Sequence, residues 1–132
     1  MRLRLFEERM EIDDITYRII GAAYKIHSHF GPGLLESAYA ECLCYVLKEE
    51  GLLVEREKWL PLVYDDYELK TGYRLDLCIE NRVVVETKSV DLINDVHIAQ
   101  LLTYLKLSKC KIGLLLNFKV ADMKKGIKRV IL

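Results

Sequence analysis

The chain has 132 residues with 20 basic and 20 acidic side chains, so its formal net charge at pH 7 is zero. A composition of 52% apolar and 30% charged residues is typical of a folded domain with one core and excludes a disordered chain. Apolar stretches stay well below the roughly 18 residues of a transmembrane helix, and the N-terminal sequence turns acidic where a signal peptide stays apolar. We therefore expect a single cytoplasmic domain over residues 1–132 that makes no contact with a membrane.

The four cysteines lack the CxxC spacing of zinc and iron–sulfur sites, which favours free thiols in the core. Charge is unevenly distributed along the chain. Residues 106–132 carry eight basic side chains and one acidic side chain, a net charge of +7, and the first 105 residues carry −7. A basic end of the chain could bind a phosphate backbone, or it could be an ordinary solvated surface. The sequence leaves both interpretations open.

The first half of the chain predicts two helices and an extended segment. Apolar residues recur at helical spacing from Ile15 to Phe30, and the Gly31-Pro32-Gly33 turn ends that helix. A second helix is expected from about residue 34 to residue 50. Residues 53–64 have loose strand character, and Pro61 predicts a sheet edge or a bend there.

The second half predicts a hairpin, a helix and a buried strand. Two apolar runs, Tyr73–Ile79 and Val83–Val90, flank a polar three-residue loop. A helix follows from about residue 94 to residue 107. The continuous apolar run Lys111–Phe118 is typical of a strand buried on both faces, paired in parallel with Val83–Val90 through a right-handed crossover. The tail, residues 126–132, can add an edge strand. The predicted order is α-α-β-β-β-α-β, an α/β fold with a mixed central sheet flanked by helices.

Three charged residues of the hairpin suggest chemistry. Strand alternation places Glu86 and Lys88 on one face, and a three-residue loop places Asp76 directly opposite Glu86, with Cβ atoms about 5 Å apart. Two carboxylates that close repel unless a cation lies between them, and Mg²⁺ binds through one or two carboxylates. Alternatively, Lys88 could neutralise one carboxylate in a buried ion pair without a metal. Such a pair is costly to keep without a function, which favours a metal site.

The same residues resemble a known family. Asp76, a nine-residue gap and then Glu86-Thr87-Lys88 resemble the signature of the PD-(D/E)XK nuclease superfamily, although Leu75 stands where the superfamily's name implies proline. The segment GLLESAY, residues 33–39, matches the motif of the small bacterial GxxExxY proteins placed in that superfamily. Residues 97–105 and 113–118 continue the resemblance, which covers about residues 12–131. It implies a restriction-endonuclease-like core and divalent-metal-dependent cleavage of nucleic acid.

The resemblance also suggests further site residues, each with a structural alternative. Glu36 would complete the metal shell of Asp76 and Glu86 directly, through water or by holding Lys88, or it would simply favour the dipole of its helix. Tyr39 would pack under the site or hydrogen-bond Glu36. The pair Gln100 and Tyr104, four residues apart on one helix face, would support the site or contact substrate, with His97 one turn earlier. Alternatively, all three are polar residues on a half-exposed helix.

The sequence thus predicts hydrolysis of a phosphodiester bond, with Glu36, Asp76, Glu86 and Lys88 as catalytic residues and Mg²⁺ or Mn²⁺ as cofactor. DNA is favoured over RNA as the substrate, and a homodimer could cover both strands of a duplex. The alternative is a nucleic-acid-binding or protein-binding module that keeps the fold without catalysis.

Overall fold

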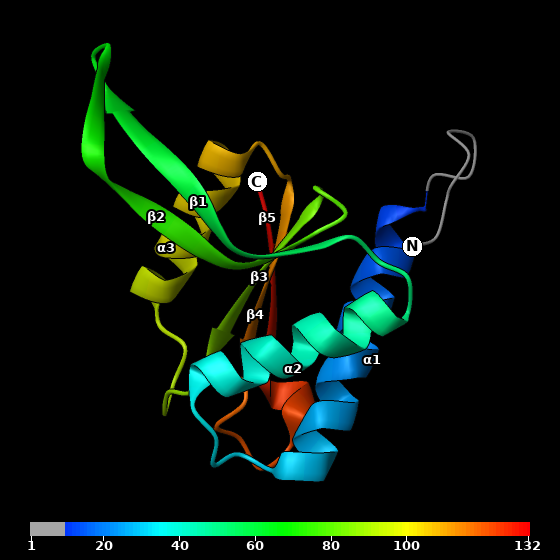
Figure 1. The fold of residues 1–132 in the computed structure, drawn as a ribbon. Coiled ribbons are helices and arrows are strands. Elements are labelled where there is room, and N and C mark those ends of the chain that lie inside the picture. The colour runs from blue at the N-terminus through cyan, green and yellow to red at the C-terminus, as the bar shows by residue number, and fades with distance from the viewer. Residues whose placement is uncertain (1–9) are drawn as a thin grey trace.

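The computed structural model describes residues 10–132, so most of the N-terminal segment that argued against a signal peptide lies outside the described residues. A five-stranded sheet carries α1 and α2 on one face and α3 on the other (Figure 1). The elements are α1 (Ile12–Phe30), α2 (Glu36–Glu49), β1 (Val54–Tyr64), β2 (Tyr67–Ile79), β3 (Val83–Lys88), α3 (Asp95–Ser108), β4 (Ile112–Asn117), η2 (Met123–Gly126) and β5 (Ile127–Ile131).

The sheet has the order β1-β2-β3-β4-β5, in which only β3 and β4 run parallel. Their parallel pairing follows from the α3 crossover and confirms the sequence prediction. The predicted C-terminal edge strand is β5, which pairs antiparallel with β4. The α/β class, the mixed sheet and the element order are all confirmed.

The helices bury the faces that their apolar spacing predicts. In α1 the residues Ile15, Ile19 and Ile26 are buried against the sheet. Phe30 departs from the prediction because it is the last residue of α1, where the chain turns at Gly31, and 48% of it is exposed. Among residues 10–132, no helix combines the length and apolar character that crossing a membrane requires.

Two apolar clusters lie on the two faces of the sheet. In β3, Val83 and Val85 pack toward α1 and α2, and Val84 packs toward α3. This is the alternation expected of a strand that is covered on both sides. Glu86 and Lys88 follow Val84 in the alternation, so they lie on the α3 face.

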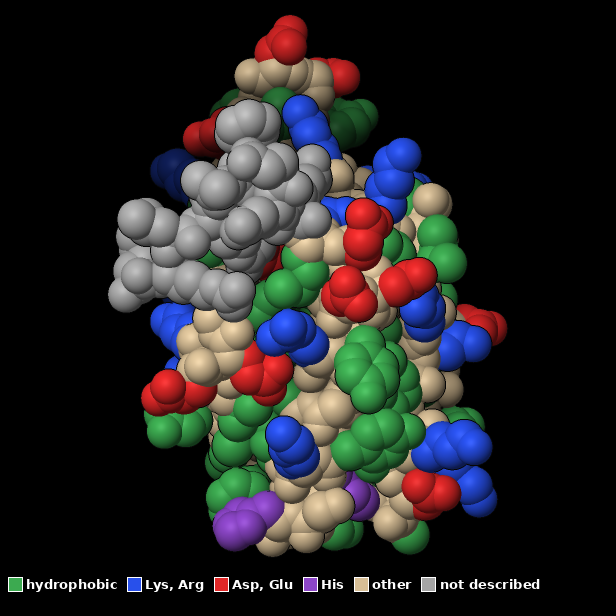
Figure 2. All heavy atoms as spheres, turned by 90° about the vertical axis from the view of Figure 1, so that its right-hand side faces the viewer, with side chains coloured by type: hydrophobic (Ala, Val, Ile, Leu, Met, Phe, Trp, Pro, Cys, Tyr) green, Lys and Arg blue, Asp and Glu red, His purple; other side chains and the backbone are tan. Residues whose placement is uncertain are grey.

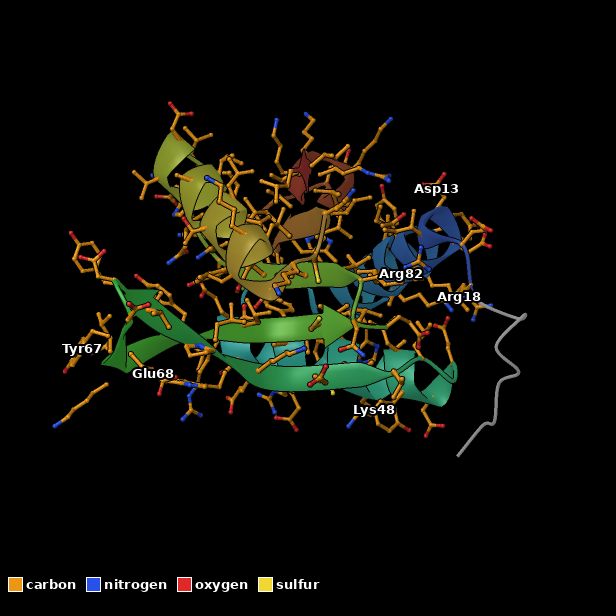
Figure 3. All side chains as sticks on the ribbon, turned by 90° about the horizontal axis from the view of Figure 1, so that it is seen from above. Asp13, Arg18, Lys48, Tyr67, Glu68 and Arg82 are labelled. Carbon is orange, nitrogen blue, oxygen red and sulfur yellow. The ribbon has the colours of Figure 1, made fainter. Side chains whose placement is uncertain are left out.

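The β1–β2 hairpin extends beyond the body of the molecule (Figures 1 and 3). Here β2 begins at Tyr67, six residues earlier than predicted, and a two-residue turn at Asp65 and Asp66 with positive φ angles of 50° and 40° joins it to β1. At the tip, Tyr67 and Glu68 lie at the opposite end of the molecule from Arg82 (Figure 3). As predicted, Pro61 lies on an edge strand at an irregularity of pairing.

The β2 strand separates from β3 at Asp76. The loop of residues 80–82 sets the register Ile79–Val83, and the ladder ends at the pair Leu77–Val85. On the other side, Glu57 of β1 interrupts its pairing with β2 at the same level and has a left-handed φ of 55°. A fork therefore opens between β2 and β3, with Asp76 on one side of it and Glu86 on the other.

Candidate active site at the fork of β2 and β3

Glu86 is the most unusual residue of the fork. It lies in β3, is only 5% exposed, and its Oε1 has no hydrogen-bond partner among residues 10–132. A buried carboxylate oxygen without a donor is costly, because desolvation of a charged group needs a compensating partner. A proton or a cation bound at this oxygen would remove that cost.

Asp76 spans the fork from β2. Its Oδ2 accepts a hydrogen bond from the backbone N–H of Thr87 at 2.9 Å, where the diverging β2 backbone no longer pairs. The Thr87 hydroxyl lies 3.0 Å from the same oxygen and 3.2 Å from the Glu36 carbonyl oxygen, either of which can accept its single proton. These bonds fix the carboxylate of Asp76 beside β3.

The two carboxylates interact directly. Burial, the adjacent charge of Asp76 and a hydrogen bond between the two side chains together raise the pKa of Glu86 to about 9, while Lys88 acts in the opposite direction. Glu86 therefore keeps its proton near neutral pH when no cation is present. A divalent cation would replace that proton, because it stabilises both carboxylates in their charged form.

Lys88 points along the α3 face of the fork. Its Nζ donates to Oε1 of Gln100 in α3 at 3.4 Å. The ion pairs of residues 10–132 include none between Lys88 and either carboxylate, although the charge of Lys88 lowers the pKa of Glu86. Lys88 is half-buried and free to approach an anionic ligand at the carboxylates.

Tyr104 closes the site from α3. It is only 6% exposed, and burial raises its pKa to about 12, with the charges of Glu86 and Asp76 contributing in the same direction. The phenol is therefore a neutral hydrogen-bond donor near the carboxylates. The structure thus brings Gln100 and Tyr104 to the same side of the fork as Lys88.

Glu36 lies at the start of α2, on the other side of β3. Its Oε2 accepts a hydrogen bond from the backbone N–H of Ser89 at 2.9 Å, directly after Lys88. In residues 10–132, no group of three or more acidic, histidine or cysteine side chains is arranged to hold a metal. Glu36 therefore ties α2 to the end of β3, and its side chain is not gathered with Asp76 and Glu86 into a three-ligand group.

Tyr39 and His97 have structural contacts. Tyr39 is fully buried, stacks on Phe118 with ring centroids 4.0 Å apart, and accepts a hydrogen bond at its hydroxyl from the Leu34 backbone N–H at 3.0 Å. It packs beneath the site and contacts the turn before α2 rather than the Glu36 carboxylate. His97 forms a reciprocal cap with Asn94 at the start of α3.

Asn117 is a positioning residue that sequence reasoning missed. It ends β4 opposite Lys88, and it is 3% exposed. Its Nδ2 donates to the Val90 carbonyl oxygen at 3.0 Å, and its Oδ1 accepts from the Val90 N–H at 3.1 Å, which holds the loop that leaves the site. An amide that ends an otherwise apolar run was the available signal.

Comparisons with known proteins identify the family of the chain. A family model described as the PD-(D/E)XK nuclease superfamily matches residues 13–130. The chain belongs to this superfamily. No curated protein matches the chain. A solved structure described as "Crystal structure of SSO0001" is similar over 95% of this chain and 70% of that chain, at 15% identity and a TM-score of 0.48.

PD-(D/E)XK nucleases generally use divalent metal ions to cleave nucleic acid, and the donor atoms at the fork fit such an ion. Asp76 and Glu86 offer only oxygen ligands, and one of those oxygens is buried and unpaired. Mg²⁺ commonly binds through one or two carboxylates and completes its shell with water and substrate oxygens. A site with two carboxylates and no third acidic ligand is therefore compatible with such an ion.

Residues of the basic C-terminal run lie at both ends of the sheet. Arg129 pairs with Asp13 at 3.2 Å, and Lys119 pairs with Asp91 at 2.7 Å. Lys111 precedes β4 and so lies at the opposite end of the sheet from the carboxylates. On the side of the molecule that carries α1, basic and acidic side chains are interspersed (Figure 2). The run is thus divided along the sheet and is partly neutralised.

Proposed function

We propose that the chain is a nuclease that hydrolyses a phosphodiester bond of nucleic acid, DNA in preference to RNA, with Mg²⁺ or Mn²⁺ as cofactor. The observation that carries this proposal is the unpaired buried Oε1 of Glu86 beside the carboxylate of Asp76. A structural residue would have its partners within the fold. An oxygen-lined site for a divalent ion explains why this carboxylate is kept.

Asp76 and Glu86 would hold the ion, which supplies Lewis acidity and lowers the pKa of bound water. Lys88 would place its ammonium where negative charge gathers on the phosphate, with Gln100 orienting its side chain. Tyr104 would donate a hydrogen bond within the site.

Glu36 would contribute in two ways. Its bond to Ser89 fixes the end of β3, and its carboxylate would reach a metal through water. Tyr39 and His97 would support the site through the turn before α2 and the cap of α3. The motif GLLESAY supports placement among the bacterial GxxExxY proteins. We further propose one domain over the whole chain, a cytoplasmic location and a homodimer.

Metal titration by calorimetry and cleavage assays on single- and double-stranded DNA and RNA test this proposal. Asp76→Ala should lose both metal binding and cleavage, since one carboxylate holds Mg²⁺ poorly. Lys88→Ala should retain metal binding while cleavage falls by about 10²-fold or more. Glu49→Ala, which removes an exposed carboxylate at the end of α2, serves as the matched control and should change neither. Absence of metal-dependent cleavage by pure wild-type protein on every substrate would contradict the proposal.

A non-catalytic binding module is the second candidate. It is favoured by the lack of a three-ligand group in the described part of the chain. On this alternative Lys88 serves the fold by offsetting the two carboxylates. Lys88→Ala should then lower the free energy of unfolding by about 3–5 kcal/mol, with no cleavage to lose.

A further inference from the structure

A hollow of about 260 Å³ adjoins the carboxylate site on the α3 face. Tyr73 of β2 forms one wall, near the base of the β1–β2 hairpin, and α3 forms the other. The residues of α3 that line the hollow are Val96, Ala99, Gln100, Thr103 and Tyr104. This volume falls just below the roughly 300–1,000 Å³ of sites for drug-sized ligands, so the hollow suits a single planar ring system.

The walls of the hollow are aromatic and apolar, with a polar edge. Tyr73 is 39% exposed and its ring lies 5.4 Å from that of Tyr104, while Val96 is 73% exposed. Lysine and arginine are absent from the lining, so the hollow is poorly suited to a phosphate. A nucleobase has the matching chemistry, because it presents a flat face for stacking and hydrogen-bonding groups at its edge.

The hollow is connected to the proposed reaction centre by two shared residues. Gln100 lines the hollow and accepts the hydrogen bond from Lys88, and Tyr104 lines it while interacting with the charges of Glu86 and Asp76. The Nε2 group of Gln100 donates to no partner among residues 10–132, and it is available to the edge of a base. A strand with a phosphate at Lys88 would therefore bring a neighbouring base to the hollow.

We propose that this hollow binds one unpaired nucleobase next to the scissile phosphate, so the enzyme acts on a single-stranded segment. The inference rests on the proposed function, because it assigns the substrate class of that site. A base in a duplex has its faces covered by its neighbours and must leave the stack to enter such a hollow. Stacking on Tyr73 is tolerant of base identity, so sequence preference should be weak.

Binding without catalysis provides the test. Fluorescence anisotropy in EDTA measures the affinity of the full chain for a labelled single-stranded oligonucleotide of about 12 nucleotides and for the matching duplex, as DNA and as RNA. Tyr73→Leu should weaken single-strand binding about tenfold and leave duplex binding unchanged, and Tyr73→Phe should retain wild-type affinity. Tyr24→Leu in α1 is the control, because Tyr24 is also 39% exposed but lines a different surface.

Oligonucleotides that each carry one abasic site complete the experiment. At one position of the oligonucleotide, an abasic site should weaken binding by wild type by the same factor as Tyr73→Leu does. The affinity of the Tyr73→Leu protein should not fall further with that oligonucleotide. Equal effects of Tyr73→Leu on single strands and duplex, no effect on either, or no binding by wild type would overturn the inference. Thermal melts of each variant exclude misfolding. Cleavage without a Tyr73 effect would reject the base site alone, and a Tyr73 effect without cleavage would reject the proposed catalysis alone.

Discussion

Thr87 and Glu86 are neighbours in β3, and both are buried, but they differ in how their polar atoms are satisfied. Thr87 faces α1 and α2, where its hydroxyl has two acceptors within 3.2 Å. Glu86 faces α3, where its Oε1 has no partner among the described residues. The Thr87 hydroxyl is satisfied within the fold, and the Glu86 carboxylate has one oxygen that the described residues leave without a hydrogen bond. The α3 face of β3 therefore carries the buried oxygen that the described part of the fold leaves unsatisfied.

The largest expected effect comes from replacing the unsatisfied group. Glu86→Gln keeps the volume of the side chain but cannot provide a second carboxylate to a divalent ion. A metal contributes several kcal/mol to the transition state, so cleavage should fall by about 10³-fold, and Mg²⁺ affinity should fall with it. Initial rates and calorimetric titration measure both. Glu41→Gln on the exposed surface of α2 is the control, and a Glu86→Gln enzyme with wild-type activity would refute the comparison.

The same residue should make stability depend on pH. The pKa of Glu86 is about 9 in the fold against an ordinary value of 4.5, so the folded state keeps a proton that the unfolded state has already released. The contribution of this retained proton to the free energy of unfolding is fully present below about pH 4.5, and it is lost as the pH rises through about 9. Without metal, wild type should lose stability relative to Glu86→Gln between about pH 5 and pH 9, by several kcal/mol.

Urea unfolding in EDTA at a series of pH values measures this difference. Mg²⁺ should restore the stability of wild type most strongly at the alkaline end, because the ion binds the ionised carboxylates. Glu86→Gln should show no such metal effect. A constant stability difference between the two proteins across this range would mean that Glu86 titrates normally and that its site holds no proton.

Replacing Asn117, a buried side chain whose amide is hydrogen-bonded, should reduce stability and leave metal binding unchanged. Asn117→Ala leaves the Val90 N–H and carbonyl groups without the bonds they form with the amide. We expect the free energy of unfolding to fall by about 3 kcal/mol, measured by urea unfolding, with Mg²⁺ affinity close to wild type. Asn94→Ala, which removes the exposed cap of α3, is the matched amide control and should cost about 1 kcal/mol. An Asn117→Ala protein that is stable but does not bind Mg²⁺ would place Asn117 in the metal site instead.

Local sequence patterns predicted the strand pairing around the fork. The three-residue loop after Ile79 fixed the register of β2 and β3, which is why Asp76 and Glu86 were expected on one face. The apolar run of β4 follows a helix, and this order predicted that β4 pairs in parallel with β3. Each of these features depends on residues that are close in the sequence.

Contacts between distant elements were not predictable in this way. The bond from Glu36 to Ser89 depends on how α2 packs on the sheet, which the stacking of Tyr39 on Phe118 helps to set. The extension of β2 to Tyr67 was missed because polar residues and Gly72 hide the alternation. Two aspartates between tyrosines were the available signal for that turn.

The smallest expected effect concerns the fork itself, at a residue whose side chain makes no contribution to the core. Glu57 is exposed and has a φ of 55°, a conformation that β-branched residues adopt only with strain. Glu57→Val should lower the free energy of unfolding by about 1–2 kcal/mol, and Glu57→Gly should raise it by up to about 1 kcal/mol. Urea unfolding compares both with Glu55→Val in the same strand, where φ is ordinary and only a surface ion pair with Lys58 is lost, so that valine should cost at most about 0.5 kcal/mol. Equal stability of Glu57→Val and Glu55→Val would mean that the left-handed residue is not needed where β2 leaves β3. In that case the hydrogen bonds of Thr87 alone would hold the carboxylate of Asp76 close to that of Glu86.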